Sequence, residues 1–448
     1  MKNPFRAFMD IRKGELSLSL LMFSYFFLVI TSFWILKPLK KTLFITFYQQ
    51  DGFGIVGWNM SASQAELLAK ILNMVVAFAA VATFTWLSRR FRRQQLTIIF
   101  SAFFMVCYVI FYFLAQDPGS VTVWSFYLFG DLFSTLMVAT FFAFMNDSVT
   151  PDSARRLYGL IGFGGVAGGA FGSLVVRMWI SMISIATWLW VTFALTLMIG
   201  IIAHFAGKLA VQGGDGVPEL EDKQLSSDAR ESEETGEKNA ALEGARLVFR
   251  SKYLLAIVGV VGFYEIASTI LDFQFTATVE HYVAAADIAS HFSTVYTITN
   301  FMAMFVQLFL TSFIMTRFSV KTALMILPGA ILFASMGFAA APVLIIGSAL
   351  NTVDNGFSYS INQSAKETLY VPTTRNEKYK AKAFIDMFVQ RFAKVLAVGI
   401  SLLITMLFKD FSSVRYLSFV IFAIAVLWIL TVRYAGKRFE ELAGPGGR

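Results

Sequence analysis

One stretch of the sequence decides the fold: Trp34-Ile35-Leu36-Lys37-Pro38-Leu39-Lys40-Lys41-Thr42. It follows about twenty mostly apolar residues, 16–36, and a helix of that length crosses a lipid bilayer. Apolar sequence continues at 43–47, so the lysines and the proline interrupt the first membrane segment rather than end it. Because a lysine inside a membrane costs free energy, its presence there indicates a functional site.

The composition is that of a polytopic membrane protein. Of the 448 residues, 57% are apolar and 15% are charged, whereas soluble domains contain about 25% charged residues. The apolar segments are about twenty residues long and do not alternate like the roughly ten-residue strands of a barrel, which predicts an all-α bundle. Basic cytoplasmic loops explain the net charge of +8, so we expect the bilayer and no nucleic acid as a partner.

The sequence lacks the residues that several kinds of chemistry require. The single cysteine, Cys107, excludes a disulfide within the chain and a multi-thiol metal site. Segment 16–36 is too long for the apolar part of a cleavable signal peptide and has no small-residue cleavage site. There is no phosphate-binding loop, zinc-protease motif or nucleophile elbow, and the three histidines are scattered. We therefore expect no enzyme, no metal and no cofactor, and any transport to be secondary.

The apolar segments predict about twelve membrane spans in two groups of six. Their approximate cores are 16–36 (extending to about 47), 66–88, 95–115, 122–145, 158–178, 187–207, 253–272, 289–316, 323–340, 342–364, 383–407 and 416–434. The acidic, Ser- and Gly-rich segment 212–250 reads as a disordered linker whose end forms a surface helix. It separates a half at 1–211 from a half at 251–448, the outline of a transporter of the major facilitator type. The length suits one transport unit, so we expect a functional monomer.

Lysine and arginine alternate between the loops in a way that predicts cytoplasmic termini. The amino end, the carboxyl end and every second loop are basic, and most of the opposite loops have no lysine or arginine. The last outside loop, with Lys409 and Arg415, is a mild exception. Lys37, Lys40 and Lys41 break the pattern strongly, because they lie toward the outer end of the first span.

The eleventh predicted span has a polar stripe. Asp386, Gln390 and Lys394 fall at i, i+4 and i+8 on one helical face, and Arg391 borders it. Lys394 is expected near mid-membrane, where a lysine costs about 3 kcal/mol. Two interpretations stay open. Lys394 forms an internal salt bridge with Asp386, Asp354 or Glu367, or it and Arg391 bind an anion.

Other polar residues inside predicted spans are candidates for the same site. Span ten contains Asn351, Asp354 and Asn355, which is typical of a helix that lines water, and Asp354 is a candidate counter-charge or proton carrier. Glu265 and Asp131 are further candidates for balancing cations. Glu66 and Lys70, one helical turn apart, are interpreted as a plain surface pair.

The fifth predicted span contains a glycine stripe. Gly164, Gly168 and Gly172 fall at i, i+4 and i+8, and Gly165 and Gly169 at i and i+4. Such a stripe allows another backbone to approach closely. It indicates either static packing or a sliding contact between the halves.

The span-one lysines have two interpretations. They extend to outer head groups, or they converge with the span-eleven cations on an anion between the halves. Against the first, apolar sequence continues beyond them. So many cations suit phosphates better than a small monoanion.

Several stretches resemble the nucleotide (ATP/ADP) translocase family of plastids and obligate intracellular bacteria, with relatives in free-living bacteria. The similar stretches are Ile35–Leu43, Phe144–Asp147, Ala154–Gly165, Leu271–Phe275, Thr299–Phe301, Tyr359–Pro372, Lys380–Asp386 and Arg391–Lys394. The resemblance covers nearly the whole membrane region and not the linker. The family often has an acidic residue where Lys41 stands.

The resemblance implies a twelve-helix, major-facilitator-like carrier in a bacterial inner membrane, with exchange of ATP for ADP or import of nucleotide with protons. The family's important lysines match Lys40 and Lys394. We expect the substrate-binding residues to be Lys37, Lys40, Asn351, Asn355, Arg391 and Lys394, with counter-charges or proton sites at Asp131, Glu265, Asp354 and Asp386. The alternatives are a proton-coupled carrier of another organic or phosphorylated anion, with Asp354 or Glu265 taking the proton, and a non-transporting membrane protein on the same fold.

Overall fold

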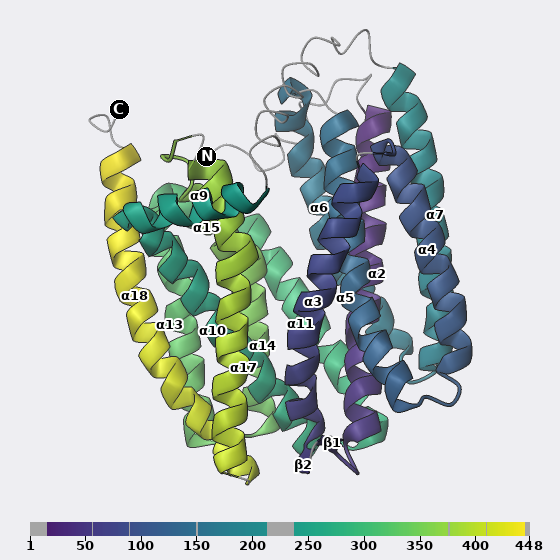
Figure 1. Cartoon of the computed structure of the whole chain (residues 1–448), viewed down its shortest axis with the longest axis vertical. Helices are drawn as coiled ribbons and strands as arrows, with labels where there is room; N and C mark the ends of the chain where they lie inside the picture. Colours follow the sequence, from purple (N-terminus) through teal and green to yellow (C-terminus); the bar gives the residue numbers. More distant parts are fainter. Residues whose placement is uncertain are drawn as a thin grey trace. The chain divides into compact units, whose positions relative to one another are not determined.

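The computed structural model describes residues 16–55, 57–88, 90–148, 151–212, 237–374, 377–408 and 410–443. Nearly all elements in these residues are helices (Figure 1). The chain divides by its packing into two units, residues 1–215 with 283–304 and residues 216–282 with 305–448. Segment 283–304, which the sequence places in the second half, thus packs with the first unit. The division into six and six spans stays a prediction.

The first unit contains seven α-helices among its described residues. They are α2 (Leu16–Tyr48), α3 (Ala62–Ser88), α4 (Arg93–Leu114), α5 (Ser120–Ser148), α6 (Pro151–Trp179), α7 (Ile185–Gln212) and, after the short turn η1 (Ala285–Asp287), most of α11 (Ile288–Phe305). A two-stranded antiparallel hairpin, β1 (Phe53–Ile55) and β2 (Trp58–Met60), joins α2 to α3. Gly57 in its turn has φ +81°, a backbone conformation that glycine adopts without strain.

Helix α2 is the central helix of the first unit and packs against α5, α6 and α7. It has 33 residues, about 50 Å at 1.5 Å per residue, so it is longer than the bilayer core is thick. The helix continues through Pro38, so the predicted extension of the first span to about residue 47 is confirmed. Pro38 still lacks an N–H, so the carbonyl one turn earlier receives no helical hydrogen bond from it.

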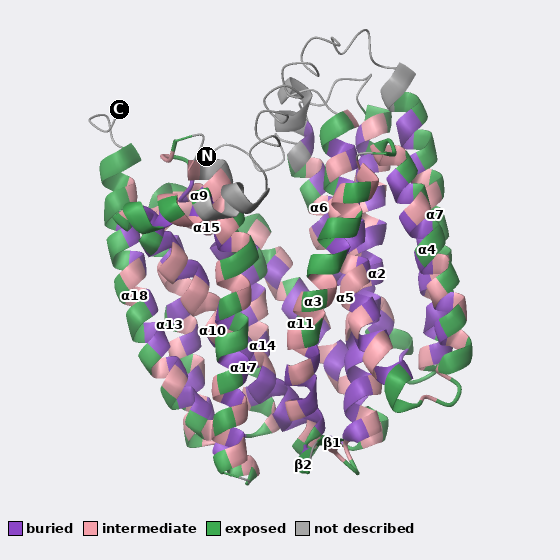
Figure 2. Ribbon diagram, viewed as in Figure 1, coloured by how far each residue is buried: buried purple, intermediate pink, exposed green. Residues whose placement is uncertain are grey.

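Helix α4 shows how the first unit separates its core from its surroundings. One stripe of α4 is buried and consists of Phe100, Phe104, Tyr108 and Phe111. Another stripe is exposed and consists of Phe103, Val106, Ile110 and Phe113. Both repeat at helical spacing, and Figure 2 shows buried and exposed residues alternating along this helix. A helix that is apolar on its outer face as well as its inner face suits lipid rather than water.

The glycine stripe of α6 packs against the backbone of α2. A Cβ atom added to Gly164 would lie 2.8 Å from the carbonyl oxygen of Phe23, and one added to Gly172 would lie 2.7 Å from that of Thr31. Thr31 Oγ1 donates a hydrogen bond to the carbonyl oxygen of Gly168 at 3.2 Å. The packing interpretation of this row is therefore confirmed. A sliding role stays a prediction.

The second unit contains the remaining helices of the described chain. They are α9 (Glu237–Arg250), α10 (Lys252–Tyr282), η2 (Val306–Thr311), α12 (Ser312–Arg317), α13 (Val320–Ala340), α14 (Leu344–Phe357), η3 (Ser358–Asn362), α15 (Gln363–Thr368), η4 (Glu377–Ala381), α16 (Lys382–Phe384), η5 (Ile385–Val389), α17 (Gln390–Leu407), η6 (Phe411–Arg415) and α18 (Tyr416–Ala443). The elements η2, η3, η4 and η5 are π-helical. Such turns occur often at functional sites, and η3 and η5 adjoin the polar candidates of spans ten and eleven.

Eleven helices in the described part of the chain are long and apolar enough to cross a membrane. The remaining predicted span, 342–364, corresponds to the helical run α14–η3–α15, Leu344–Thr368. Its polar middle, with Asn351, Asp354 and Asn355, lowers its hydropathy below that of the others. A polytopic all-α protein is confirmed.

Helix α9 confirms the predicted surface helix at the end of the linker; residues 213–236 of that linker lie outside the described residues. Lys380 of η4, just before span eleven, donates to Glu243 of α9 at 2.5 Å. A Cβ atom on Gly244 would lie 2.6 Å from the carbonyl oxygen of Lys380. Glycine at this position therefore lets α9 lie directly on the backbone of η4.

Candidate functional site: two sets of membrane lysines

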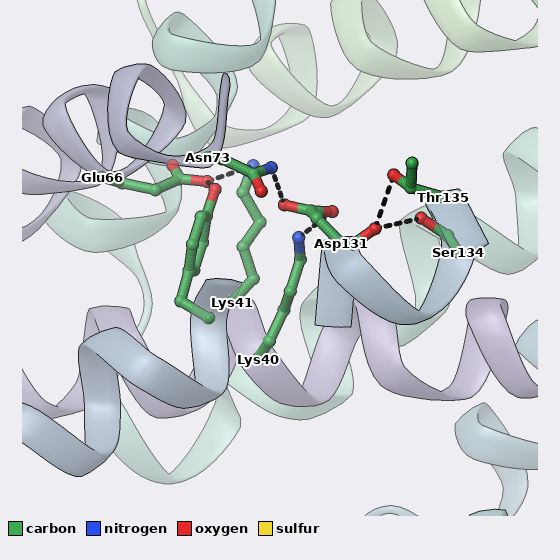
Figure 3. Close-up of polar contacts among 8 residues, drawn as sticks. Lys40, Lys41, Glu66, Asn73, Asp131, Ser134 and Thr135 are labelled. Carbon is green, nitrogen blue, oxygen red and sulfur yellow. Dashed lines mark hydrogen bonds and ion pairs between the residues drawn. The ribbon is translucent and has the colours of Figure 1, made fainter. Parts of the chain in front are cut away.

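Lys40 is buried and forms an ion pair with the partly buried Asp131 in the first unit. The Lys40 side chain on α2 points to the Asp131 carboxylate on α5, and Asn73 Nδ2 on α3 donates to the other oxygen of that carboxylate at 2.5 Å (Figure 3). Lys40 is 6% exposed. Its ammonium also lies 4.5 Å from the centre of the Tyr127 ring. Gly130 makes room, because a Cβ atom there would lie 2.8 Å from Lys40 Cδ.

Lys41 belongs to a second buried group beside the first. Its Nζ lies 3.5 Å from Glu66 Oε1 (Figure 3). The same oxygen accepts a hydrogen bond of 2.7 Å from the hydroxyl of Tyr127. Glu66 is 1% exposed and Lys41 is 3% exposed. The interpretation of Glu66 and Lys70 as a plain surface pair is therefore wrong. Packing of α3 on α2 buries Glu66 and gives it Lys41, which no spacing within α3 could indicate.

Lys37 lies among aromatic rings one turn before Lys41. Its Nζ is 4.5 Å from the centre of the Trp34 ring and 4.9 Å from that of Tyr296 on α11. Such contacts stabilise a cation where water is scarce. The interpretation that these lysines extend to outer head groups is wrong for Lys40 and Lys41, because both are buried against carboxylates.

Lys394 forms an ion pair of a different kind in the second unit. Its Nζ lies 3.4 Å from Glu265 Oε2 on α10, with the lysine side chain 48% exposed and the glutamate 12%. An internal salt bridge is therefore present, but the three partners expected from the sequence, Asp386, Asp354 and Glu367, are wrong. The spacing within span eleven favours Asp386, whereas packing of α17 on α10 brings Glu265 close.

The other second-unit candidates form hydrogen bonds among themselves and with α10. Ser268 donates to Asp354 Oδ2 at 2.6 Å, and Asp354 is 1% exposed. Asn351 Nδ2 lies 3.4 Å from Asp272 Oδ1, and Asn355 Nδ2 donates to the carbonyl oxygen of Asn351 at 3.0 Å. These residues connect spans seven and ten through a polar network inside the unit.

The candidate site residues of span eleven belong to different polar groups. Asp386 accepts a hydrogen bond of 3.0 Å from Gln390 Nε2. Glu367 pairs with Lys382 at 2.5 Å rather than with Lys394. Arg391 is partly buried on α17. Lys394 and Glu265 thus come together, while Asp386 belongs to a different group along the helix.

The structure adds residues that the sequence reasoning missed. Asn73, Tyr127 and Ser268 each bond a carboxylate of the site. Asn73 could have been recognised from the sequence, since an asparagine within an apolar span needs a partner. Tyr127 and Ser268 could not, because tyrosine and serine are common in membrane helices.

The fold is of the major facilitator type, a fold of helical membrane proteins. Among solved structures it is similar to the nucleoside transporter NupG, with a TM-score of 0.62 and 13% identity over 94% of this chain and 99% of that one. It is also similar to the inward-open xylose transporter XylE from E. coli, with a TM-score of 0.57 and 13% identity over 96% of this chain and 99% of that one. At such identity the likeness establishes the fold alone.

The sequence model of the TLC ATP/ADP transporter family matches residues 119–344 and 339–439, so the chain belongs to that family. It is 20% identical to ADP,ATP carrier protein 1 of Rickettsia conorii, covering 88% of this chain and 89% of the relative. It is 23% identical to ADP,ATP carrier protein 1 of Chlamydia muridarum, covering 97% and 91%. With the plastidic ATP/ADP-transporter of Solanum tuberosum it shares 22% identity over 71% of this chain and 54% of that one. The resemblance seen in the sequence is confirmed.

Proposed function

We propose that this chain carries adenine nucleotides across a lipid bilayer by alternating access, and that its membrane lysines bind the phosphate groups. The observation that supports this best is the pair of the buried Lys40 with Asp131, in a member of an ATP/ADP transporter family. A buried ion pair is seldom worth more to stability than well-packed apolar residues. Its presence inside a span is therefore better explained by a ligand than by folding.

Asp131 neutralises Lys40 when no anion is bound. A phosphate offers several acceptor oxygens and more negative charge than one carboxylate, so it competes for the same ammonium. Asn73 bonds the second carboxylate oxygen and holds Asp131 in place while Lys40 changes partner. The exchange of one anion for another avoids leaving a bare cation in the membrane at any step.

Lys394 and Glu265 supply the same chemistry in the second unit. The lysine is half exposed, so it is open to an incoming anion without first leaving a buried position. Arg391, Asn351 and Asn355 are further proposed contacts of the nucleotide, and Asp386 is a proposed counter-charge for the cations of span eleven.

Uptake of labelled ATP into proteoliposomes tests the proposal. We expect uptake into vesicles preloaded with ADP and much slower uptake into empty vesicles, since exchange needs a counter-substrate. No uptake and no binding of any nucleotide would contradict the proposal.

A second candidate is a proton-coupled carrier of another organic or phosphorylated anion. It is favoured by Asp354, a buried carboxylate bonded to Ser268, and by Glu265 beside Lys394. It predicts that a pH gradient drives uptake into empty vesicles. Competition by nucleotides, sugar phosphates and carboxylates would then identify the anion.

We further propose a bacterial inner membrane, cytoplasmic termini and a functional monomer. The basic loops support the orientation. Thiol labelling of single cysteines placed in a cysteine-free variant, from either side of the membrane, tests it.

A further inference from the structure

We propose that Glu66 is a proton-binding residue of the transport cycle, and that Lys41 couples its proton to the nucleotide. This rests on the proposed function. Glu66 is 1% exposed near the start of α3. One of its oxygens, Oε1, faces Lys41 Nζ at 3.5 Å and accepts the Tyr127 hydroxyl at 2.7 Å. The other, Oε2, is buried and receives no hydrogen bond in the described part of the chain.

The two oxygens of Glu66 therefore have different roles. Oε1 is held by a hydroxyl donor and a cation. Oε2 is buried and has an open lone pair, so it is the atom at which a proton can bind. A buried carboxylate stays ionised only while a cation or several donors compensate it. At Glu66 the cation is Lys41 and the donor is the Tyr127 hydroxyl.

Proton binding is coupled to nucleotide binding when Lys41 moves from Glu66 to a phosphate. If a phosphate takes Lys41, Glu66 loses its cation, and protonation of Oε2 removes the resulting buried charge. The proton comes from the solution on the side to which the site is open and returns to solution when Lys41 comes back. Nucleotide binding therefore takes up a proton, and by linkage a low pH tightens nucleotide binding.

The described charged groups that neighbour Glu66 do not include a second buried carboxylate oxygen without a hydrogen bond. On α2, Lys40 is paired with Asp131 of α5, whose carboxylate also accepts from Asn73. On α3 itself, Lys70 lies one turn from Glu66. On α11, the ring of Phe292 lies 5.5 Å from Lys41 Nζ, and its chain neighbour His291 is the titratable residue there. Among these groups the described structure shows an open carboxylate oxygen at Glu66 alone.

Calorimetric titration of the full-length protein with ATP tests the inference. The same titration in two buffers of different ionisation enthalpy gives the number of protons taken up per nucleotide. We expect the wild type to take up nearly one proton more than Glu66→Gln, which keeps the Tyr127 bond but cannot bind a proton. Comparing the two proteins cancels protons taken up by ATP itself. The affinity of the wild type should fall by up to about tenfold per pH unit as pH rises, and that of Glu66→Gln much less.

Matched control variants test whether the proton binds at Glu66. Glu440→Gln, on the exposed end of α18, should behave as the wild type. His291→Gln should also keep the proton, and its loss there would assign the proton to His291 and overturn the inference. If Glu66→Gln does not fold, Lys41→Met/Glu66→Gln removes both charges of the pair; it should bind ATP more weakly, through the remaining lysines, and without the extra proton.

The outcomes separate the two proposals. Equal proton uptake by the wild type and the Glu66 variants, with nucleotide bound, overturns the role of Glu66 and leaves nucleotide transport intact. Loss of the proton in Asp354→Asn or Glu265→Gln, with retention in Glu66→Gln, also overturns it. No binding of any nucleotide by the wild type overturns the proposed function and this inference together.

Discussion

Lys40 of α2 and Asp131 of α5 form an ion pair inside the first unit, next to a glycine whose missing side chain leaves room for the lysine. Two helices thus place together opposite charges that are about ninety residues apart in the sequence. The pair has a second support in Asn73 of α3. Three helices therefore fix one ammonium group, which is the kind of preorganisation that a binding site needs.

Replacing Lys40 separates the contribution to stability from the contribution to transport. Lys40→Met leaves the partly buried Asp131 unpaired, and breaking such a pair costs about 3–5 kcal/mol when both partners are buried. Because the Asp131 side chain is 25% exposed, we expect the lower end of that range, measured by thermal unfolding in detergent. Lys40→Met/Asp131→Asn removes both charges and should recover most of this stability.

The same double variant should still transport ATP at least tenfold more slowly than the wild type, since the phosphate ligand is missing. Lys437→Ala, on the exposed end of α18, is the matched control and should change neither measurement. Recovery of transport together with stability would show that the pair is purely structural.

Replacing Lys394 makes the same comparison of stability and transport in the second unit. The Lys394 side chain is half exposed but Glu265 is 12% exposed, so Lys394→Ala alone leaves a largely buried carboxylate without its cation. Lys394→Ala/Glu265→Gln removes both charges, and we expect it to leave the unfolding temperature nearly unchanged, because half-exposed ion pairs contribute about 0–1 kcal/mol, and to reduce ATP uptake strongly. A variant with normal uptake would remove Lys394 from the proposed binding residues.

Gly130→Ala tests the space beside Lys40. The new methyl group would lie 2.8 Å from Lys40 Cδ, so the lysine must move away from its position. We expect weaker ATP binding in a fluorescence or calorimetric titration. Gly162→Ala on α6 is the control, because a Cβ atom there has no neighbour within 4 Å. A similar loss in both variants would mean that the effect is not local to Lys40.

Gly172→Ala tests the packing of α6 on α2. The added Cβ would lie 2.7 Å from the carbonyl oxygen of Thr31, and backbone yields less readily than a side chain. Overpacking of this kind costs about 1–3 kcal/mol, which lowers the unfolding temperature. Gly399→Ala on α17, where the Cβ has open space, should be neutral or stabilising. Equal unfolding temperatures for these two variants would contradict the close approach.

The sequence by itself determined the membrane helices, because runs of about twenty apolar residues have few other ways to satisfy their backbone groups. It also singled out the charged residues, since a lysine or a carboxylate inside such a run is costly wherever it points. Lys40, Lys394, Asp131 and Glu265 were all found in this way. The glycine row on α6 was found too, because its spacing follows from the helix alone.

Only the tertiary structure decided which charges meet. Spacing along one helix suggested Asp386 for Lys394 and Lys70 for Glu66, and the actual partners are Glu265 and Lys41, each on another helix. An ion pair between helices depends on which helices are neighbours and on how each is rotated about its axis. Neither is contained in the periodicity of a single segment, so the partners appear only when the helices pack.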